Sequence, residues 1–225
     1  WMKYASGIAT RCCGTPAATE SHSAFERDFQ HHGSPSVKAN TVAELIADIK
    51  AKPGQYNYGS SGNGTIVHLT GELFKSMTGT YIVHIPYRGT ALVIPDMVSG
   101  QIQLLFDNVA SALPHIRDGR VKALGVTSLK RSPLLPNLPT VADTVPGFEV
   151  GAWGVLMAPR GTPPAIINTL NQAVRTALAL PDVRDGFLKQ SFHPAPMTPA
   201  ETATFLRSES DKWAKVVREA NIKLN

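Results

Sequence analysis

Short apolar segments alternate with amphipathic helical patterns between residues 40 and 126. The extended segments are expected at residues 55–58, 81–85, 102–106 and 121–126, and the helices at residues 42–51, 65–76, 91–98 and 109–116. Strands and helices that alternate at this spacing are typical of a parallel or mostly parallel sheet covered by helices. The sequence therefore predicts an α/β fold that binds its ligand at the carboxyl ends of the strands.

The expected helices carry recognisable start signals. Thr41 and Glu44 have the spacing of a capping box, as do Thr198 and Glu201, and Asn108 is placed to cap the helix that follows it. For the helix that begins near Thr65, an apolar period of 3.6 predicts one inward stripe. That stripe consists of Ile66, Leu69, Leu73 and Met77.

The remaining segments differ in character. Residues 1–38 show no apolar period of 2 or 3.6, so we expect a poorly specified segment. The proline-rich stretch 134–146 is expected to be a linker. An extended segment at 148–158, a helix capped by Thr162 and ending near Leu180, a short helix after Pro181 and a long helix after Thr198 should follow.

Composition excludes several classes of function. The net charge of +5 comes without any run of Lys or Arg, and only 7% of residues are aromatic, which argues against nucleic-acid binding. Cys12 and Cys13 are adjacent and cannot close an ordinary disulfide loop, and the histidines are too scattered for a metal site. We expect no cofactor, no membrane span and no signal peptide in this chain.

The loop Gly59–Gly64 is the most informative candidate site. It joins an expected strand to an expected helix, and its glycines permit backbone N–H groups to converge on an anion at the positive end of the helix dipole. Side-chain donors that do not titrate near neutral pH lie in or beside it, namely Ser60, Ser61, Asn63 and Thr65. The alternative is that Asn63 or Thr65 only caps the helix.

Three sharper motifs fail at residues that their chemistry requires. A P-loop needs Lys after its last glycine, but Thr65 follows Gly64. A nucleophile elbow needs glycine where Asn63 stands. A dinucleotide turn lacks its third small residue at Val67, although Arg88 is placed to face a 2′-phosphate, so an NADP-type oxidoreductase domain stays as an alternative.

Other candidate ligand contacts follow the neighbouring strands. Tyr87, Arg88 and Asp107 come just after strand ends, where an α/β sheet places its ligand contacts. His68 lies four residues beyond Gly64, but a helical wheel puts it opposite the expected apolar stripe, so an exposed or locally bonded histidine is the favoured interpretation.

Several ordered motifs between residues 39 and 223 resemble the Bug family of solute-binding proteins of tripartite tricarboxylate transporters. The motifs are Tyr58-Gly59-Ser60-Ser61-Gly62-Asn63-Gly64 with His68, Ile85-Pro86-Tyr87-Arg88-Gly89, Phe106-Asp107, Leu138-Pro139-Thr140-Val141, Ala152-Trp153-Gly154 and Ala158-Pro159-Arg160-Gly161-Thr162-Pro163. The resemblance implies a non-enzymatic, periplasmic protein of the type II periplasmic-binding-protein class, which holds a small carboxylate between two lobes.

The resemblance also implies an organisation and partners. Residues 39–148 match lobe two, residues 149–225 match the chain's return into lobe one, and residues 1–38 have no counterpart of the family's initial lobe-one portion, so lobe one is expected to be incomplete. Ser60, Ser61, Gly62, Asn63, Gly64, Thr65 and His68 would line the carboxylate cradle, and Tyr87, Arg88 and Asp107 would orient the rest of the ligand. The expected partners are the transporter's membrane components, the expected state is a monomer, and a non-binding fragment is the other alternative.

Overall fold

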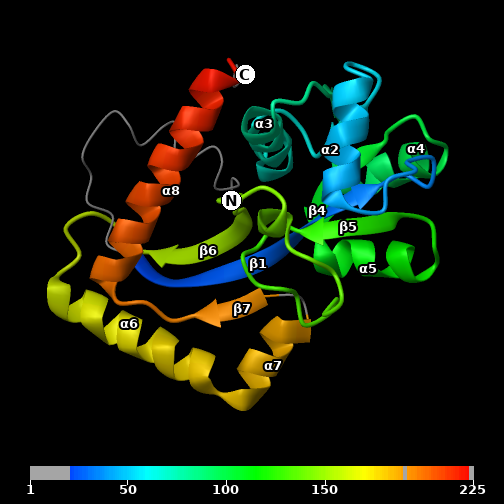
Figure 1. Ribbon diagram of the computed structural model, residues 1–225. Coiled ribbons are helices and arrows are strands. Elements are labelled where there is room, and N and C mark those ends of the chain that lie inside the picture. The colour runs from blue at the N-terminus through cyan, green and yellow to red at the C-terminus, as the bar shows by residue number, and fades with distance from the viewer. Residues whose placement is uncertain (1–20, 190–191, 223–225) are drawn as a thin grey trace. The chain divides into compact units, whose positions relative to one another are not determined.

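A computed structural model describes residues 21–189 and 192–222 of the chain (Figure 1). These residues divide into two compact units. The larger unit contains residues 28–151 and 216–222, and the smaller one contains residues 21–27, 152–189 and 192–215. The chain passes between the units inside strand β1 (Ser21–Gly33), at the start of β6 (Gly151–Met157) and inside helix α8 (Pro199–Glu219).

The larger unit is built on a mixed sheet with the strand order β3-β2-β4-β1-β5. Strand β2 (Asn57–Ser60) pairs in parallel with both β3 (Val83–Pro86) and β4 (Leu104–Asn108). Strand β1 is antiparallel to β4 and to β5 (Lys122–Val126). The prediction of a mostly parallel α/β sheet is confirmed, with β1 as the antiparallel member.

Strand β1 lies in a region where the sequence predicts no regular element. Its residues 29–33 pair with β4 on one edge and its residues 30–33 with β5 on the other, with a register shift between His31 and His32. Backbone ladders on both edges can hold a strand that has no apolar period of its own. The structure places residues 21–33 of the segment expected to be poorly specified in a strand, while residues 1–20 lie outside the described part of the chain.

Thr41, Thr65 and Asn108 cap three helices of the larger unit, and the helix 93–98 starts without a side-chain cap. The helices are α2 (Val42–Ala51), α3 (Ile66–Thr78), α4 (Val93–Val98), preceded by a 3₁₀ turn at Thr90–Leu92, and α5 (Val109–Arg117). Thr41 accepts a hydrogen bond from the amide of Glu44, and Asn108 accepts one from the amide of Ala110. The Glu44 carboxylate accepts from Asn40 rather than from Thr41, so the expected box at α2 is only half formed.

Large side chains from strands and helices meet in the core of this unit. Phe74 of α3 packs against Phe106 of β4 and Phe148, with ring centroids 5.8 Å and 6.1 Å apart, and all three rings are fully buried. Leu45 and Ile49 of α2 are also 0% exposed. Burial of a large apolar side chain stabilises a fold by about 1.5–3 kcal/mol, so these contacts fix α2 and α3 against the sheet.

The smaller unit places β1 between two strands, with β6 on one edge and β7 (Phe192–Ala195) on the other (Figure 1). Its helices are α6 (Pro164–Ala179), α7 (Pro181–Lys189) and α8. Thr198 and Glu201 exchange hydrogen bonds at the start of α8, as a capping box requires. Thr162 does not cap α6, because its hydroxyl donates to the carbonyl of Pro159.

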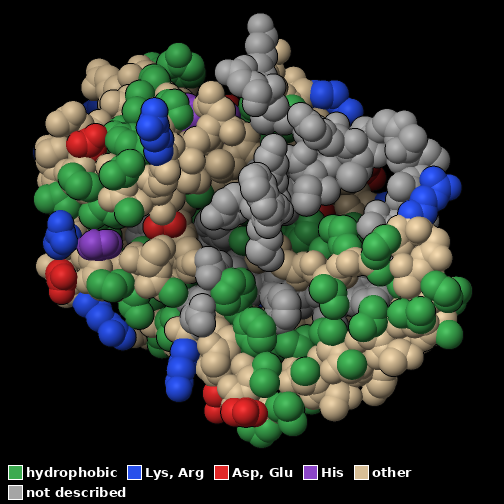
Figure 2. Space-filling view, turned by 180° about the vertical axis from the view of Figure 1, so that it is seen from behind, with side chains coloured by type: hydrophobic (Ala, Val, Ile, Leu, Met, Phe, Trp, Pro, Cys, Tyr) green, Lys and Arg blue, Asp and Glu red, His purple; other side chains and the backbone are tan. Residues whose placement is uncertain are grey.

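A carboxylate of α8 accepts hydrogen bonds from two indoles, one in β6 and one in α8, and we call this group the indole clamp. Glu209, which is buried, accepts from the Nε1 atoms of both Trp153 and Trp213 at 3.0 Å. Hydrophobic side chains are also exposed on this unit (Figure 2). Exposed side chains of this kind are Leu156, Met157, Ile166, Leu170 and Leu180.

Candidate functional site

The carboxyl ends of three parallel strands bring the predicted site residues to one edge of the larger sheet. Strand β2 ends at Ser60 and leads into the Gly/Ser loop, β3 ends just before Tyr87, and β4 contains Asp107 as its penultimate residue. The amide of Tyr87 donates to the carbonyl of Ser60 at 3.0 Å, which fixes the two neighbouring strand ends to each other. The ends of β2 and β3 therefore lie side by side at this edge.

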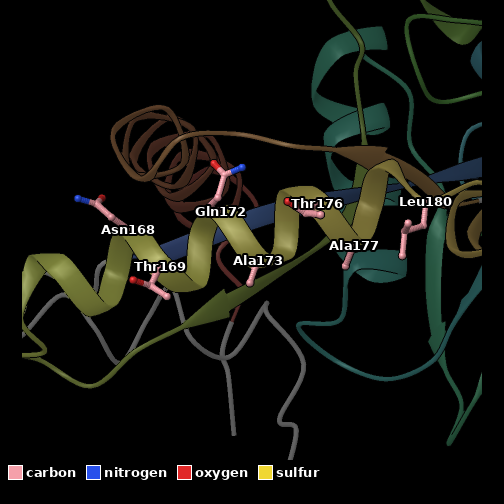
Figure 3. Close-up of a pocket in the computed structure, with 7 residues that line it drawn as sticks. All are labelled: Asn168, Thr169, Gln172, Ala173, Thr176, Ala177 and Leu180. Carbon is pink, nitrogen blue, oxygen red and sulfur yellow. The ribbon is translucent and has the colours of Figure 1, made fainter.

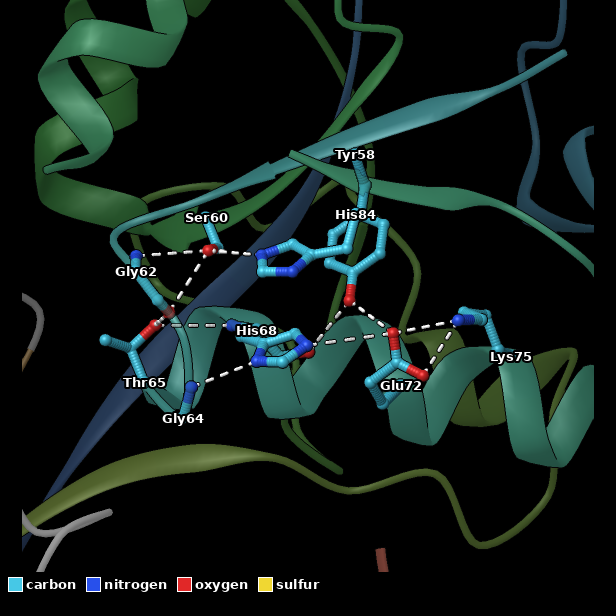
Figure 4. A network of polar contacts seen from close by, with 9 residues as sticks. All are labelled: Tyr58, Ser60, Gly62, Gly64, Thr65, His68, Glu72, Lys75 and His84. Atoms are coloured by element: carbon cyan, nitrogen blue, oxygen red, sulfur yellow. Dashed lines mark hydrogen bonds and ion pairs between the residues drawn. The ribbon is translucent and has the colours of Figure 1, made fainter. Parts of the chain in front are cut away.

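The loop between β2 and α3 is held by its own hydrogen bonds (Figure 4). Gly62 and Gly64 have φ angles of 127° and 72°, which residues with a side chain rarely adopt. The amide of Gly62 donates to Ser60 Oγ at 3.1 Å, and the amide of Gly64 donates to His68 Nδ1 at 3.0 Å. Thr65 Oγ1 donates to the carbonyl of Gly62 at 2.8 Å and caps α3 by accepting from the amide of His68.

These bonds change the part that each predicted cradle residue can play. The sequence predicts that the amides of Gly62 and Gly64 face a ligand, but the amide of Gly62 donates to Ser60 in the loop and that of Gly64 donates to His68 of α3. Ser60, which is fully buried, and Thr65 also use their hydroxyls within the loop. Within the described residues, the side chains of Ser61 and Asn63 take part in no hydrogen bond, and they are half-buried and exposed respectively.

His68 lies on the inner face of α3. The helical wheel favours an exposed or locally bonded His68 opposite the apolar stripe. His68 is locally bonded, to the amide of Gly64, but it is only 6% exposed, whereas Met77 of that stripe is 38% exposed. Leu69 of the predicted stripe is buried, and the other buried residues of α3 are Val67, His68, Thr70, Gly71, Glu72, Phe74 and Thr78. A polar side chain can take this face because the sheet supplies its partners, which a pattern of apolar residues does not reveal.

His84 of β3 is the site residue that sequence reasoning missed. Its ring stacks on that of His68, with centroids 3.8 Å apart and an interplanar angle of 7°. Its Nε2 atom lies 2.6 Å from Ser60 Oγ. Burial lowers the pKa of His84 to about 4, and burial also lowers the pKa of His68, so both imidazoles are neutral at pH 7.

A second group of polar side chains, from β2 and α3, lies next to the two histidines. Tyr58, which is opposite His84 in the strand register, donates its hydroxyl to Glu72 Oε1 at 2.6 Å. Lys75 Nζ lies 2.8 Å from both carboxylate oxygens of Glu72. Burial, together with the hydrogen bond to Glu72, raises the pKa of Tyr58. The spacing of His68, Glu72 and Lys75 along one helix was the available sequence signal for this cluster.

The three remaining predicted residues have different surroundings. Tyr87 donates its hydroxyl to Asp96 Oδ2 of α4 at 2.5 Å, and burial with this hydrogen bond raises the pKa of Tyr87 to about 12. Asp107 is buried and accepts from Ser111 Oγ at 3.0 Å. Arg88 is exposed. Of the three, Arg88 therefore presents the charged group that solvent reaches most easily.

A separate groove follows one side of α6 in the smaller unit (Figure 3). Its lining runs from Asn168 to Leu180 and consists of Asn, Thr, Gln, Ala and Leu side chains. None of the described residues that line it is charged, so these residues offer no cation to an anionic ligand. Over residues 21–189 and 192–222, no group of three or more metal-ligating side chains is present, and no helix there is long and apolar enough to cross a membrane.

Two α/β units, with the Gly/Ser loop at the carboxyl ends of the parallel strands of a mixed sheet, have the fold of a periplasmic binding protein. A solved R. palustris protein, Rpa4515 with adipate, superposes with a TM-score of 0.78 at 32% identity, covering 93% of this chain and 71% of that one. MatC from Rhodopseudomonas palustris, solved with bound malate, gives a TM-score of 0.73 at 28% identity, covering 88% and 69%.

The family follows from the sequence comparison. The family model described as "Tripartite tricarboxylate transporter family receptor" matches residues 32–222, and the chain belongs to this family. BugT of Bordetella pertussis is 37% identical over 85% of this chain. The chain spans 59% of the length of BugT, and 55% of a related protein from Pseudomonas sp. strain P51.

Proposed function

We propose that this chain is the solute-binding receptor of a tripartite tricarboxylate transporter and captures a small carboxylate at the loop between β2 and α3. The observation that carries the proposal is the loop itself, in which internal bonds hold the backbone while the side chains of Ser61 and Asn63 stay available. Membership of the receptor family, and the adipate and malate in the two solved relatives, support a carboxylate as the ligand.

The physical basis is a set of neutral donors at a helix start. The first amides of a helix have no intrahelical acceptors, and the helix dipole places partial positive charge there. α3 has 13 residues, so this dipole is fully developed at the loop. Ser61 and Asn63 add donors that do not titrate near neutral pH.

The rest of the ligand would meet the neighbouring strand ends. Arg88 is the residue for a second carboxylate, because a guanidinium pairs with a carboxylate through two hydrogen bonds. Asp107 accepts from Ser111 and would accept from a ligand hydroxyl as well. Tyr87 would contribute its ring edge and backbone, since its hydroxyl is bonded to Asp96.

The same proposal includes the setting in which the receptor works. We assign residues 39–148 to the family's second lobe and residues 149–225 to the return into the first. The receptor would act as a monomer in the periplasm, without catalysis or a cofactor, and would deliver its ligand to the transporter's membrane components. Gel filtration tests the monomer.

Calorimetric titration with adipate and with malate tests the binding site. Ser61→Ala should weaken the better ligand about 10- to 150-fold, because a hydrogen bond to a charged group contributes about 1.5–3 kcal/mol. Asn63→Ala should act similarly. Ser76→Ala, near the opposite end of α3, is the matched control and should bind as the wild type does. Absence of heat with any small dicarboxylate, or stabilisation by NADP instead, would contradict the proposal.

A further inference from the structure

We infer that the stacked pair His68 and His84 is a positioning element that holds the carboxylate-binding loop in its binding shape before the ligand arrives. This inference rests on the function proposed above. Neither imidazole is a ligand contact in it. Each ring instead fixes one end of the loop, and the two rings brace each other.

The contacts of the two rings carry the argument (Figure 4). His84 Nε2 lies 2.6 Å from Ser60 Oγ at the start of the loop, and the same hydroxyl accepts from the amide of Gly62. His68 Nδ1 accepts from the buried amide of Gly64 at the end of the loop. The ring centroids are 3.8 Å apart and nearly parallel, so the two anchors are in direct contact.

The anchored backbone leaves few residues between the two fixed points. Ser61 and Asn63 flank Gly62, whose amide is itself bonded, so their donors are held in place by a preformed turn. A donor that is already in place costs no ordering entropy when the ligand binds. Without the His68 acceptor, the Gly64 amide would be a buried donor with no partner, and the loop would have to rearrange.

The acceptor role requires one protonation state of His68. Nδ1 can accept only when it carries no proton, so the proton of the neutral ring is on Nε2, which lies 3.8 Å from Glu72 Oε1. The groups that face the pair are Glu72 and Lys75 of α3 and Tyr58 of β2. Glu72 is already engaged by Lys75 and Tyr58, so its charge is largely offset.

Protonation of His68 would therefore break the Gly64 anchor, because an imidazolium has donors on both nitrogens. Affinity for adipate should be constant above about pH 7 and should fall as the medium becomes more acidic, since burial lowers the pKa of both rings below the ordinary 6.5. A site in which His68⁺ contacted the ligand directly would show the opposite trend, with affinity rising toward acid.

Substitutions at both rings separate positioning from packing. His68→Asn keeps an acceptor oxygen close to the position of Nδ1, whereas His68→Leu fills the space without an acceptor. We expect His68→Leu to weaken adipate binding at pH 7 by about 10-fold or more, and His68→Asn by less than about 3-fold. His84→Gln and His84→Leu should give the same order, and His115→Asn, a half-buried histidine of the same unit, is the control.

The decisive measurements are the pH profile of adipate affinity and amide hydrogen exchange at Gly64 in the ligand-free protein. The loss of adipate affinity at acidic pH should be smaller in His68→Asn. Because adipate itself takes up protons at acidic pH, the His68→Asn profile also measures that contribution. The Gly64 amide should be protected in the wild type and in His68→Asn but exchange at least about 10-fold faster in His68→Leu.

Failure of the proposed function and failure of this inference give different results. The wild type could bind no carboxylate while its Gly64 amide is still protected in a way that needs an acceptor at position 68. That result would contradict the proposed function but support the positioning role of His68. Wild-type affinity in His68→Leu, or affinity that rises toward acid in the wild type, would overturn the positioning role. If His68→Leu does not fold, the wild-type pH profile and the His68→Asn profile decide.

Discussion

Replacing Gly71 with alanine should destabilise the larger unit, although alanine is the better helix former. Gly71 is buried in the middle of α3. A Cβ atom at this position would lie 2.3 Å from Cε2 of Tyr58 and 2.7 Å from its Cζ. Those distances are far inside van der Waals contact, so either the helix or the tyrosine ring must move.

The size of the stability loss depends on the contacts that prevent the Tyr58 ring from moving. Tyr58 is 0% exposed, stacks on His84 and donates to Glu72 at 2.6 Å. Overpacking a core costs about 1–3 kcal/mol, and a strained hydrogen bond to a carboxylate adds part of its 1.5–3 kcal/mol. The helix preference of alanine over glycine returns only about 1 kcal/mol. We expect a net loss of about 2 kcal/mol, which lowers Tm by about 4–8 °C.

Thermal unfolding followed by circular dichroism measures this change, with two comparisons. Gly186→Ala in α7 meets no atom within 4 Å, so it should leave Tm unchanged or raise it by a few degrees. Tyr58→Leu removes the opposing ring atoms, so the cost of Gly71→Ala should shrink in that background. A Gly71→Ala protein as stable as the wild type, or strict additivity in the double variant, would refute the reasoning.

The remaining predictions concern pH, a helix cap and the indole clamp. Because the pKa of His84 is about 4 in the folded chain and 6.5 when unfolded, the unfolded chain binds more protons between these values, so stability should be full above pH 6.5 and fall by up to about 2 kcal/mol at pH 5. Urea unfolding at pH 7 and 5 checks this, and equal stability at both would contradict it. Asn108→Ala should cost about 1 kcal/mol, seen as a fall in Tm of about 2–4 °C, whereas Asn108→Asp keeps the cap and should cost little. Glu209→Ala leaves the indole N–H groups of Trp153 and Trp213 without their shared acceptor, so it should lower the free energy of unfolding in urea by more than about 2 kcal/mol. Glu209→Gln keeps an acceptor oxygen and should lower it less. Equal losses in the two variants would argue against the clamp.

Local chemistry explains why much of the element order could be read from the sequence. The caps at Thr65, Asn108 and Thr198 each need only a side-chain oxygen and an amide two or three residues later. A predicted cap failed where the side-chain oxygen bonds to another residue, even a nearby one. Thr162 had the right type and position for a cap, but α6 begins after Pro163, and the hydroxyl donates to Pro159 instead.

The sequence likewise predicted only part of the candidate site. Its location at the end of β2 followed from the order of strand, Gly/Ser loop and helix, which the sequence alone contains. The sequence did not show which donors are available to a ligand. The amide of Gly64 donates to Nδ1 of His68, and the burial of His68 depends on the sheet. The part of His84 was equally hidden, since its partners Ser60 and His68 belong to another strand and a helix.

The sequence by itself determined where strands and helices lie between residues 40 and 126, because apolar period and capping act between near neighbours. Tertiary structure decided that residues 21–33 form a strand, since its ladders are supplied by β4 and β5. It also decided that the polar side chains of His68 and Glu72 in α3 are buried. Buried polar groups are stable only where another element brings a hydrogen-bonding partner, and that partner is distant in the sequence.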